Sequence, residues 1–171
     1  LGDGGHIGRN PQMIVDLLLD LLPLRQTYLA QTATAPSQLL NAIDRMMPML
    51  RLFRLGDGSL ALFNGMGSTA PHALATVLAY DDARADALTN APYSGYQRME
   101  ANDAVLVMDC GPAPAPEFSD RAHAGCLAFE FSSGPQRMIV NCGSPDESRT
   151  NLREAARSTA AHSTLVVADS S

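Results

Sequence analysis

The feature that most constrains the fold is a change in hydrophobic period close to residue 56. Before it, apolar side chains recur every three or four residues, which is the period of an amphipathic helix; after residue 93 they alternate or form short apolar runs, which are typical of strands. Helices followed by antiparallel strands indicate an α+β fold, or two layers contributed by two domains. The boundary is expected between Gly56 and Pro92.

Two helices are predicted in the first part. One begins at Pro11, since proline suits the first helical turn, and reaches Pro23, with "LRQTYLAQ" as a continuation beyond a kink. The other follows "TAPS", with Ser37 as the predicted N-cap and a bend expected at Pro48. Its apolar stripe, suited to packing against another helix, consists of Leu39, Ile43, Met46, Leu50 and Phe53.

The second part predicts one short helix and a series of strands. Turn residues at 56–58 lead to a helix over roughly Pro71 to Tyr80. "CLAFEFSS" and "QRMIVNCG" are typical of two strands joined by a turn at Gly134 and Pro135. The other predicted strands are "YQRMEAN", "AVLVMDC" and the final run "STLVVAD".

The three cysteines match no zinc-binding spacing. In a hairpin centred on Gly134, Cys126 and Cys142 would face each other. A disulfide between them is one interpretation, and two small buried thiols are the other.

Composition restricts the class of partner. The chain is 46% hydrophobic and 18% charged, which predicts a folded core. Its net charge of −6 argues against nucleic acid, because phosphate binding requires an excess of basic side chains. An anionic ligand would need a local arginine cluster. No apolar run approaches the ~20 residues of a membrane span. No export signal is visible. We interpret the chain as an internal segment of a longer protein, because it begins without an initiator Met and stops directly after a strand-like run.

Histidines are the first candidates for chemistry, because their pKa lies closest to neutrality. His72 is expected to be solvated at the start of the short helix, whereas His6, His123 and His162 stand at element boundaries among small residues. If the strands that follow His123 and His162 are neighbours, both rings reach the same end of a sheet. A structural, hydrogen-bonded role is the alternative for each ring.

Four motifs resemble the heparinase II/III-like polysaccharide lyases. "ARSTAAHSTLVV" is similar to the family's "FRSTAAHNTVVV", and "RAHAGCLAFE" is similar to "HxHADxLSFE". "DGGHIGRNP" resembles "DGGxxERSPxYH", and "GYQRM" resembles "GYxRM". The matches follow the family's order and extend over nearly the whole chain.

The resemblance implies an incomplete fragment of a two-layer fold. Residues 1–55 would be the last helices of an α/α toroid, 56–92 a connection, and 93–171 the start of an antiparallel β-sandwich. The family binds acidic polysaccharide between these layers and cleaves it by β-elimination, in which a base removes the C5 proton of a uronate and an acid protonates the leaving oxygen. The resemblance also implies a location in the periplasm or cell envelope; it leaves the oligomeric state undefined.

Carried over position by position, the match is partial. The family's tyrosine falls on Met13, which cannot transfer a proton, and the aspartate of "HxHAD" falls on Gly125. We therefore predict a rearranged proton relay around His6, His123 and His162. Tyr93 or Tyr96 would replace the missing tyrosine if either faces the cleft, and the alternative is that each packs at the edge of an element. The catalytic candidates are His6, His123 and Tyr96, and the substrate-binding candidates are Arg9, Asn10, Arg98, Arg121 and Arg157.

Zinc is the only cofactor that the resemblance suggests. In some family members the second histidine, the aspartate and the histidine of "AAHNT" hold a structural zinc. Here His123 and His162 remain without the carboxylate, whereas structural zinc takes four protein ligands. Three hypotheses follow: a lyase acting on acidic polysaccharide, a non-catalytic envelope glycan-binding or structural relative, and a hydrolase with a histidine-bound metal. The last has the least support, because no carboxylate-bearing metal motif is present.

Overall fold

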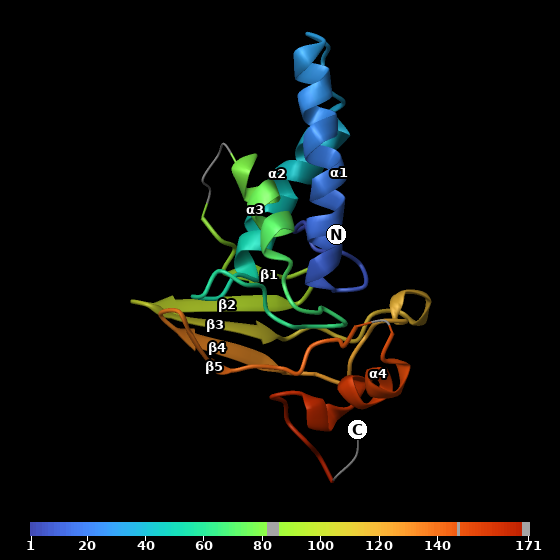
Figure 1. Ribbon diagram of the computed structural model, residues 1–171, viewed down its shortest axis with the longest axis vertical. Coiled ribbons are helices and arrows are strands. Elements are labelled where there is room, and N and C mark those ends of the chain that lie inside the picture. The colour runs from blue at the N-terminus through green and yellow to red at the C-terminus, as the bar shows by residue number, and fades with distance from the viewer. Residues whose placement is uncertain (82–85, 147, 169–171) are drawn as a thin grey trace.

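The computed structural model describes residues 1–81, 86–146 and 148–168. Three helices stand on one face of an antiparallel sheet, and a fourth lies at one end of the strands near the C-terminus (Figure 1). This is an α+β arrangement, as the change of period predicts. The four helices are α1 (Pro11–Ala30), α2 (Ser37–Leu52), α3 (Pro71–Ala79) and α4 (Thr150–Arg157).

The starts of the first two helices differ in how they are capped. Asn10 precedes α1 and accepts a hydrogen bond from the backbone N–H of Gln12 at 2.8 Å, and the helix continues through Pro23 to its end. At α2 the predicted N-cap is wrong. Pro36 occupies the cap position, and Ser37 is already helical, so its hydroxyl contacts Gln38 instead of a backbone donor. The sequence analysis did not predict α4, although "TNLREAAR" consists mostly of good helix formers.

The sheet is a five-stranded meander in which consecutive strands are antiparallel neighbours. The predicted final strand, whose residue 169 lies outside the described residues, is not formed. In its described part Val167 carries an isolated bridge rather than a ladder, and Leu165, Val166 and Val167 are 67%, 49% and 64% exposed. β-Branched residues favour strands only where neighbouring strands receive them. The strands are β1 (Asn90–Ala91), β2 (Tyr96–Ala101), β3 (Ala104–Asp109), β4 (Phe129–Ser133) and β5 (Gln136–Ile139).

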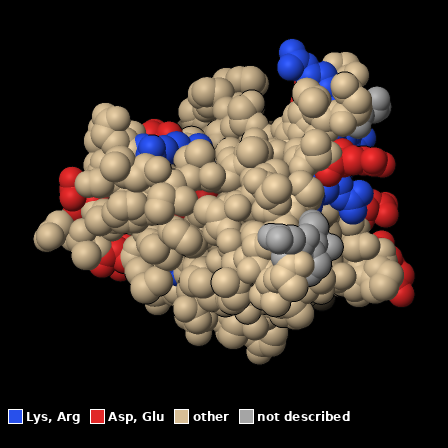
Figure 2. All heavy atoms as spheres, turned by 90° about the horizontal axis from the view of Figure 1, so that it is seen from below, with Lys and Arg blue, Asp and Glu red and all other residues tan. Residues whose placement is uncertain are grey.

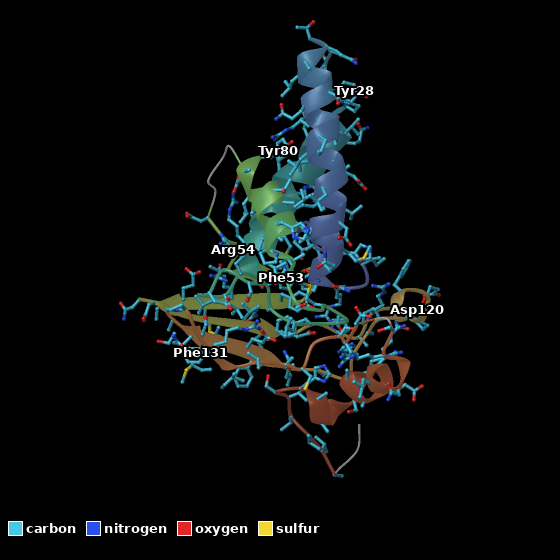
Figure 3. All side chains as sticks on the ribbon, viewed as in Figure 1. Tyr28, Phe53, Arg54, Tyr80, Asp120 and Phe131 are labelled. Carbon is cyan, nitrogen blue, oxygen red and sulfur yellow. The ribbon has the colours of Figure 1, made fainter. Side chains whose placement is uncertain are left out.

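The core lies between the helices and the sheet. The rings of Phe53 and Phe63 both contact Tyr96, with centroid distances of 4.7 and 5.3 Å, and all three side chains are almost fully buried. Figure 3 shows Phe53 between α2 and the sheet, and Phe131 on the opposite face. That opposite face is largely uncharged, with acidic and basic side chains toward its edges (Figure 2), and it carries the exposed apolar side chain of Met138.

Polar side chains of the sheet also point into the helical layer. Arg98 on β2 donates hydrogen bonds to the backbone oxygens of Leu52 and Arg54, where α2 ends and its last carbonyl groups have no helical partner. On β4, the carboxylate of fully buried Glu130 accepts from the backbone N–H of Leu62 at 3.0 Å. These contacts attach the segment after α2 to the sheet.

At Gly56 the segment after α2 lies directly against β4 and the β4–β5 turn. The N–H of Gly56 donates to Oγ of Ser132 at 2.9 Å, and a Cβ atom at this position would lie 1.8 Å from the carbonyl oxygen of Gly134 in the β4–β5 turn. No side chain fits in that space.

The cysteines correct the sequence-based expectation. Cys110, Cys126 and Cys142 are free and exposed, so neither the disulfide nor the buried thiols occur. The hairpin ladder ends at Phe129 and Ile139 and contains a register shift, which leaves Cys126 and Cys142 outside the paired region. Within the described ranges, no helix combines the length and apolar character needed to cross a bilayer.

Candidate functional site

Two histidine rings meet beside α4. Nδ1 of His123 lies 3.0 Å from Nε2 of His162, and Nδ1 of His162 lies 2.8 Å from the backbone oxygen of Ser158. The segment after His162 runs along the start of β4, where the N–H of Phe129 donates to the carbonyl of Ser163. The two rings therefore reach the same end of the sheet, as the sequence predicted, although the second segment is not a strand.

When both rings are neutral, the hydrogen bonds permit one arrangement of their protons; a charged His162 would reverse it, because its Nε2 would then donate to His123. The carbonyl of Ser158 can only accept, so Nδ1 of His162 carries the proton and its Nε2 accepts. Nδ1 of His123 must then donate to it, which leaves Nε2 of His123 with a free lone pair. The side chain of His123 lines two cavities, through which a ligand could approach the ring.

His123 is neutral at neutral pH. Burial, followed by the neighbouring charges of His162 and Arg157, lowers the pKa of His123 to about 4. A neutral imidazole with an open Nε2 accepts a proton or a hydrogen bond but does not attract an anion by charge.

Arginines supply the positive charge that His123 lacks. Arg121, Arg153 and Arg157 line a small cavity of about 30 Å³ together with His123, and Asp120 is the acidic residue among its walls. Figure 3 labels Asp120 in the loop at this end of the sheet, near α4. Three arginines against one aspartate leave the lining with a net positive charge.

Arg157 also fastens α4 to the loop that carries His123. Its Nε donates to the backbone oxygen of Ala122 at 2.9 Å, and its own backbone oxygen accepts from the N–H of Ala124 at 2.8 Å. Both neighbours of His123 are thus held by one residue. Sequence reasoning missed Arg153, because its place in the cavity depends on a helix that was not predicted.

His123 also lines a second cavity. It has a volume of about 340 Å³, within the usual range for small-molecule sites, and its polar walls include Arg9, Asn64 and Asp109. Leu165 and Val167 contribute apolar walls.

Asn64 connects the His123 loop to the core, a role that the sequence did not indicate. Its amide nitrogen donates to the hydroxyl of Tyr96 at 2.7 Å and to the carboxylate of Asp109 at 3.2 Å, while its oxygen accepts from the backbone N–H of His123 at 3.4 Å. The residue has a φ of 46°, a left-handed conformation that asparagine tolerates better than most residues.

Tyr96 and Arg9 lie in the core between the layers. The hydroxyl of Tyr96 donates to the backbone oxygen of Arg9 at 2.7 Å, and burial raises the pKa of this fully buried tyrosine far above its usual range. The guanidinium of Arg9, 7% exposed, pairs with Asp109 and donates to the backbone oxygen of Ser94. A phenol in this position has no exposed atom that could exchange a proton with a polysaccharide.

Two further candidates also hold backbone groups. Arg98 is 8% exposed and caps the end of α2, and Asn10 caps the start of α1. Tyr93, the alternative to Tyr96, is 71% exposed at the surface. Arg121 is exposed beside the His123 cavity.

His6 belongs to a different part of the molecule. It lines a cavity of about 540 Å³ with residues of the N-terminal segment, α1 and α2, including Leu17 and Arg45. Its Nδ1 accepts from the N–H of Gly8 at 3.0 Å, and burial lowers its pKa. In the described residues, no hydrogen bond and no common cavity joins His6 to His123.

The residues around the histidine pair do not fit a zinc ion. The described ranges contain no group of three or more His, Cys, Asp or Glu side chains that could hold a metal. A Cβ atom on Gly125 would lie 3.2 Å from Cδ2 of His162, so the position of the family's aspartate is adjacent to this ring but carries no carboxylate. The two rings bind each other instead.

Comparisons with known proteins give a consistent result. The family model "Heparinase II/III-like, C-terminal" matches residues 83–171. FtsZ-localized protein C from Caulobacter vibrioides is 41% identical over 172 residues, which is 100% of this chain and 29% of that protein. A solved heparinase III has a TM-score of 0.75 at 15% identity, and a heparan sulfate lyase from Pedobacter heparinus has 0.69 at 20%, each covering 99% of this chain and 31% of the other. The chain thus spans less than a third of these relatives.

Proposed function

This chain belongs to the heparinase II/III-like family, and from that premise we propose that the protein recognises a uronate-containing acidic polysaccharide without cleaving it. The chain would then be the end of a helical toroid (1–55), a connection (56–92) and the start of a β-sandwich (93–171). The observation that carries the proposal is the small cavity that His123 lines together with three arginines, Arg121, Arg153 and Arg157. Arginine suits this task because its planar fork matches a carboxylate.

The positions of the predicted proton carriers support recognition over cleavage. β-Elimination needs a base at C5 and an acid at the leaving oxygen of the same sugar. Tyr96 is enclosed in the core, His6 lines a separate cavity, and methionine stands where the family has its tyrosine. His123 alone remains beside the arginines, and a single group with a pKa of about 4 is a weak base for a carbon acid.

The test compares binding with cleavage in the full-length protein. Oligosaccharides of glucuronate, galacturonate and their sulfated relatives are titrated by calorimetry, and the same mixtures are followed by ultraviolet absorbance of the unsaturated lyase product. We expect binding without absorbance, and Arg153→Ala to weaken binding about tenfold. Arg149→Ala is the matched control, because Arg149 lies on the same helical segment but outside the cavity. Absorbance that grows with time would replace the proposal with the lyase hypothesis.

A second role is supported by the 41% identical relative, whose name associates it with FtsZ. On that ground we also propose that this protein gathers where FtsZ assembles, as an alternative to the periplasmic or envelope location that the motifs imply. A fluorescent fusion imaged beside labelled FtsZ separates the two. Coincidence of the signals supports the first, and an even outline of the cell supports the second.

A further inference from the structure

We propose that the direct contact between the rings of His123 and His162 is a metal-free clamp, which holds the loop before β4 against the segment after α4. In the same proposal, the lack of a side chain at Gly125 is what keeps a zinc ion from taking the place of this contact. The inference is independent of the proposed function, because it concerns how the site is held together and not what binds to it.

The two rings have nearly the spacing of metal ligands but lack the other members of a ligand set. Nδ1 of His123 lies 3.0 Å from Nε2 of His162. Two nitrogens bound to one tetrahedral zinc, each at about 2.0–2.1 Å, would be about 3.3 Å apart, and a structural zinc takes four protein ligands. The described part of the chain offers no cluster of three or more His, Cys, Asp or Glu side chains. The two imidazoles therefore bind each other rather than an ion.

Gly125 occupies the place from which a third ligand would reach the pair. A Cβ atom there would lie 3.2 Å from Cδ2 of His162 and 3.4 Å from Cβ of Ala128. The φ of Gly125 is not in the left-handed region, so a side chain is allowed once the neighbouring atoms shift by a few tenths of an ångström. The backbone could thus carry the carboxylate of the family's motif, which this sequence does not supply.

The hydrogen bond between the rings does not depend on which ring carries the shared proton. One of the facing nitrogens donates and the other accepts when both rings are neutral, and the same holds when one ring is charged. Nδ1 of His162 donates to the backbone oxygen of Ser158 at 2.8 Å in either case, because a carbonyl can only accept. The contact therefore forms near neutral pH without an ion.

Backbone contacts next to each ring complete the clamp. Arg157 donates from Nε to the backbone oxygen of Ala122 at 2.9 Å, and its own backbone oxygen accepts from the N–H of Ala124 at 2.8 Å. After the second ring, the carbonyl of Ser163 accepts from the N–H of Phe129 at 3.3 Å. These bonds join the same two segments as the histidine contact, so the segments have several protein anchors where a metal would have been one.

Hydrogen exchange of the full-length protein tests the clamp itself. His162→Phe removes the hydrogen bond between the rings but keeps an aromatic side chain. We expect amide exchange over residues 122–128 to become about tenfold faster, which is the effect of losing one hydrogen bond, both with added zinc and with a chelator. His72→Gln, at an exposed histidine, should leave this exchange unchanged. Unchanged exchange in His162→Phe, or faster exchange only when zinc is present, overturns the inference.

Elemental analysis tests whether an ion is held between the rings. The unmodified full-length protein and His162→Phe are produced side by side in medium that contains zinc. We expect both to hold the same amount of zinc per chain, because an ion bound elsewhere in the protein is present in both. A content that is lower in His162→Phe by one ion per chain overturns the inference.

Gly125→Asp tests whether position 125 decides between the clamp and a metal. We expect this variant to bind one more zinc per chain than the unmodified protein, since three side chains then surround one point. Its thermal midpoint should rise when zinc is added and fall with a chelator. Gly125→Asn is the matched control, because it has the same shape without the charge, and it should gain neither effect. A folded Gly125→Asp protein that gains no zinc contradicts the role of Gly125, and an unfolded one contradicts the space inferred beside His162.

Discussion

The arginines compared here lie in two regions of the molecule and have different roles in each. Arg9 and Arg98 lie between the helices and the sheet, 7% and 8% exposed, and donate to backbone carbonyls and carboxylates of the chain itself. Arg153 and Arg157, on α4, line an open cavity beside His123. In the first region the guanidinium groups donate to the chain itself. In the second region Arg157 also donates to the backbone oxygen of Ala122, whereas Arg153 lines the cavity.

A match to a family motif does not identify the role of the residues in that motif. "DGGHIGRNP" and "GYQRM" contribute Arg9, Tyr96 and Arg98, which resemble functional positions in sequence but are built into the layer interface. Buried polar groups of this kind must be fully hydrogen-bonded, so they constrain the sequence strongly without touching a ligand.

The largest effect is expected from Asp109→Ala. The substitution leaves the guanidinium of Arg9 buried without its carboxylate, and removing one partner of a buried pair costs about 3–5 kcal/mol. The free energy of unfolding, measured in urea, should fall by that amount. Arg149→Ala serves as the exposed control. A loss below about 1 kcal/mol would mean that Arg9 is not part of the layer interface.

A smaller loss is expected from Tyr96→Phe. The ring still fills the space between Phe53 and Phe63, but the amide of Asn64 and the carbonyl of Arg9 each lose a hydrogen-bond partner. An unsatisfied buried polar group costs about 1–3 kcal/mol. Tyr93→Phe, at a 71% exposed residue, should leave the urea midpoint unchanged. A Tyr96→Phe protein as stable as the unmodified one would instead allow the phenol to be a proton carrier.

Lowering the pH should reduce the stability of the folded protein through His123, which lies in the second region. An unfolded histidine binds a proton below pH of about 6.5, whereas the folded His123 does so only near pH 4. Between these values the unfolded state binds more protons, so stability falls as the pH is lowered and the decline ends near pH 4. His123→Gln should flatten this part of the profile, and His72→Gln should not. Identical profiles for all three proteins would contradict a neutral, buried His123.

The smallest effect sharpens the contrast between the two kinds of arginine. Arg153→Ala should change the free energy of unfolding by no more than about 0.5 kcal/mol, since no hydrogen bond within the described residues depends on its guanidinium. Thermal unfolding checks this directly. A destabilisation as large as that of Asp109→Ala would mean that Arg153, like Arg9 and Arg98, is needed to hold the fold together.

Periodicity predicted the parts of the fold that depend on local pattern. The apolar stripe over 39–53 and the alternation over 96–101 correspond to α2 and β2, because one face of each is buried. The meeting of His123 and His162 was predictable from two segments that approach one end of the sheet. The final strand was predicted from the β-branched residues of "STLVVAD", but the described part of this run carries an isolated bridge at Val167 rather than a ladder.

The remaining features depend on contacts between distant segments. Asn64 has its role only because a left-handed turn brings it between Tyr96 and the His123 loop, 32 and 59 residues away in the chain. Arg153 belongs to the site only because α4 packs against that loop through Arg157. Neither relation leaves a period or a spacing in the sequence.

The contact between Gly56 and the turn at Gly134 has a consequence for the engineering of this protein. With the carbonyl oxygen of Gly134 at 1.8 Å from any added Cβ, a saturation library at position 56 should return only glycine among folded clones. Even alanine would act as a wedge that separates the hairpin from the helices. Recombination with homologous chains should therefore keep residues 56 and 134 in the same inherited block, so that the two surfaces remain matched.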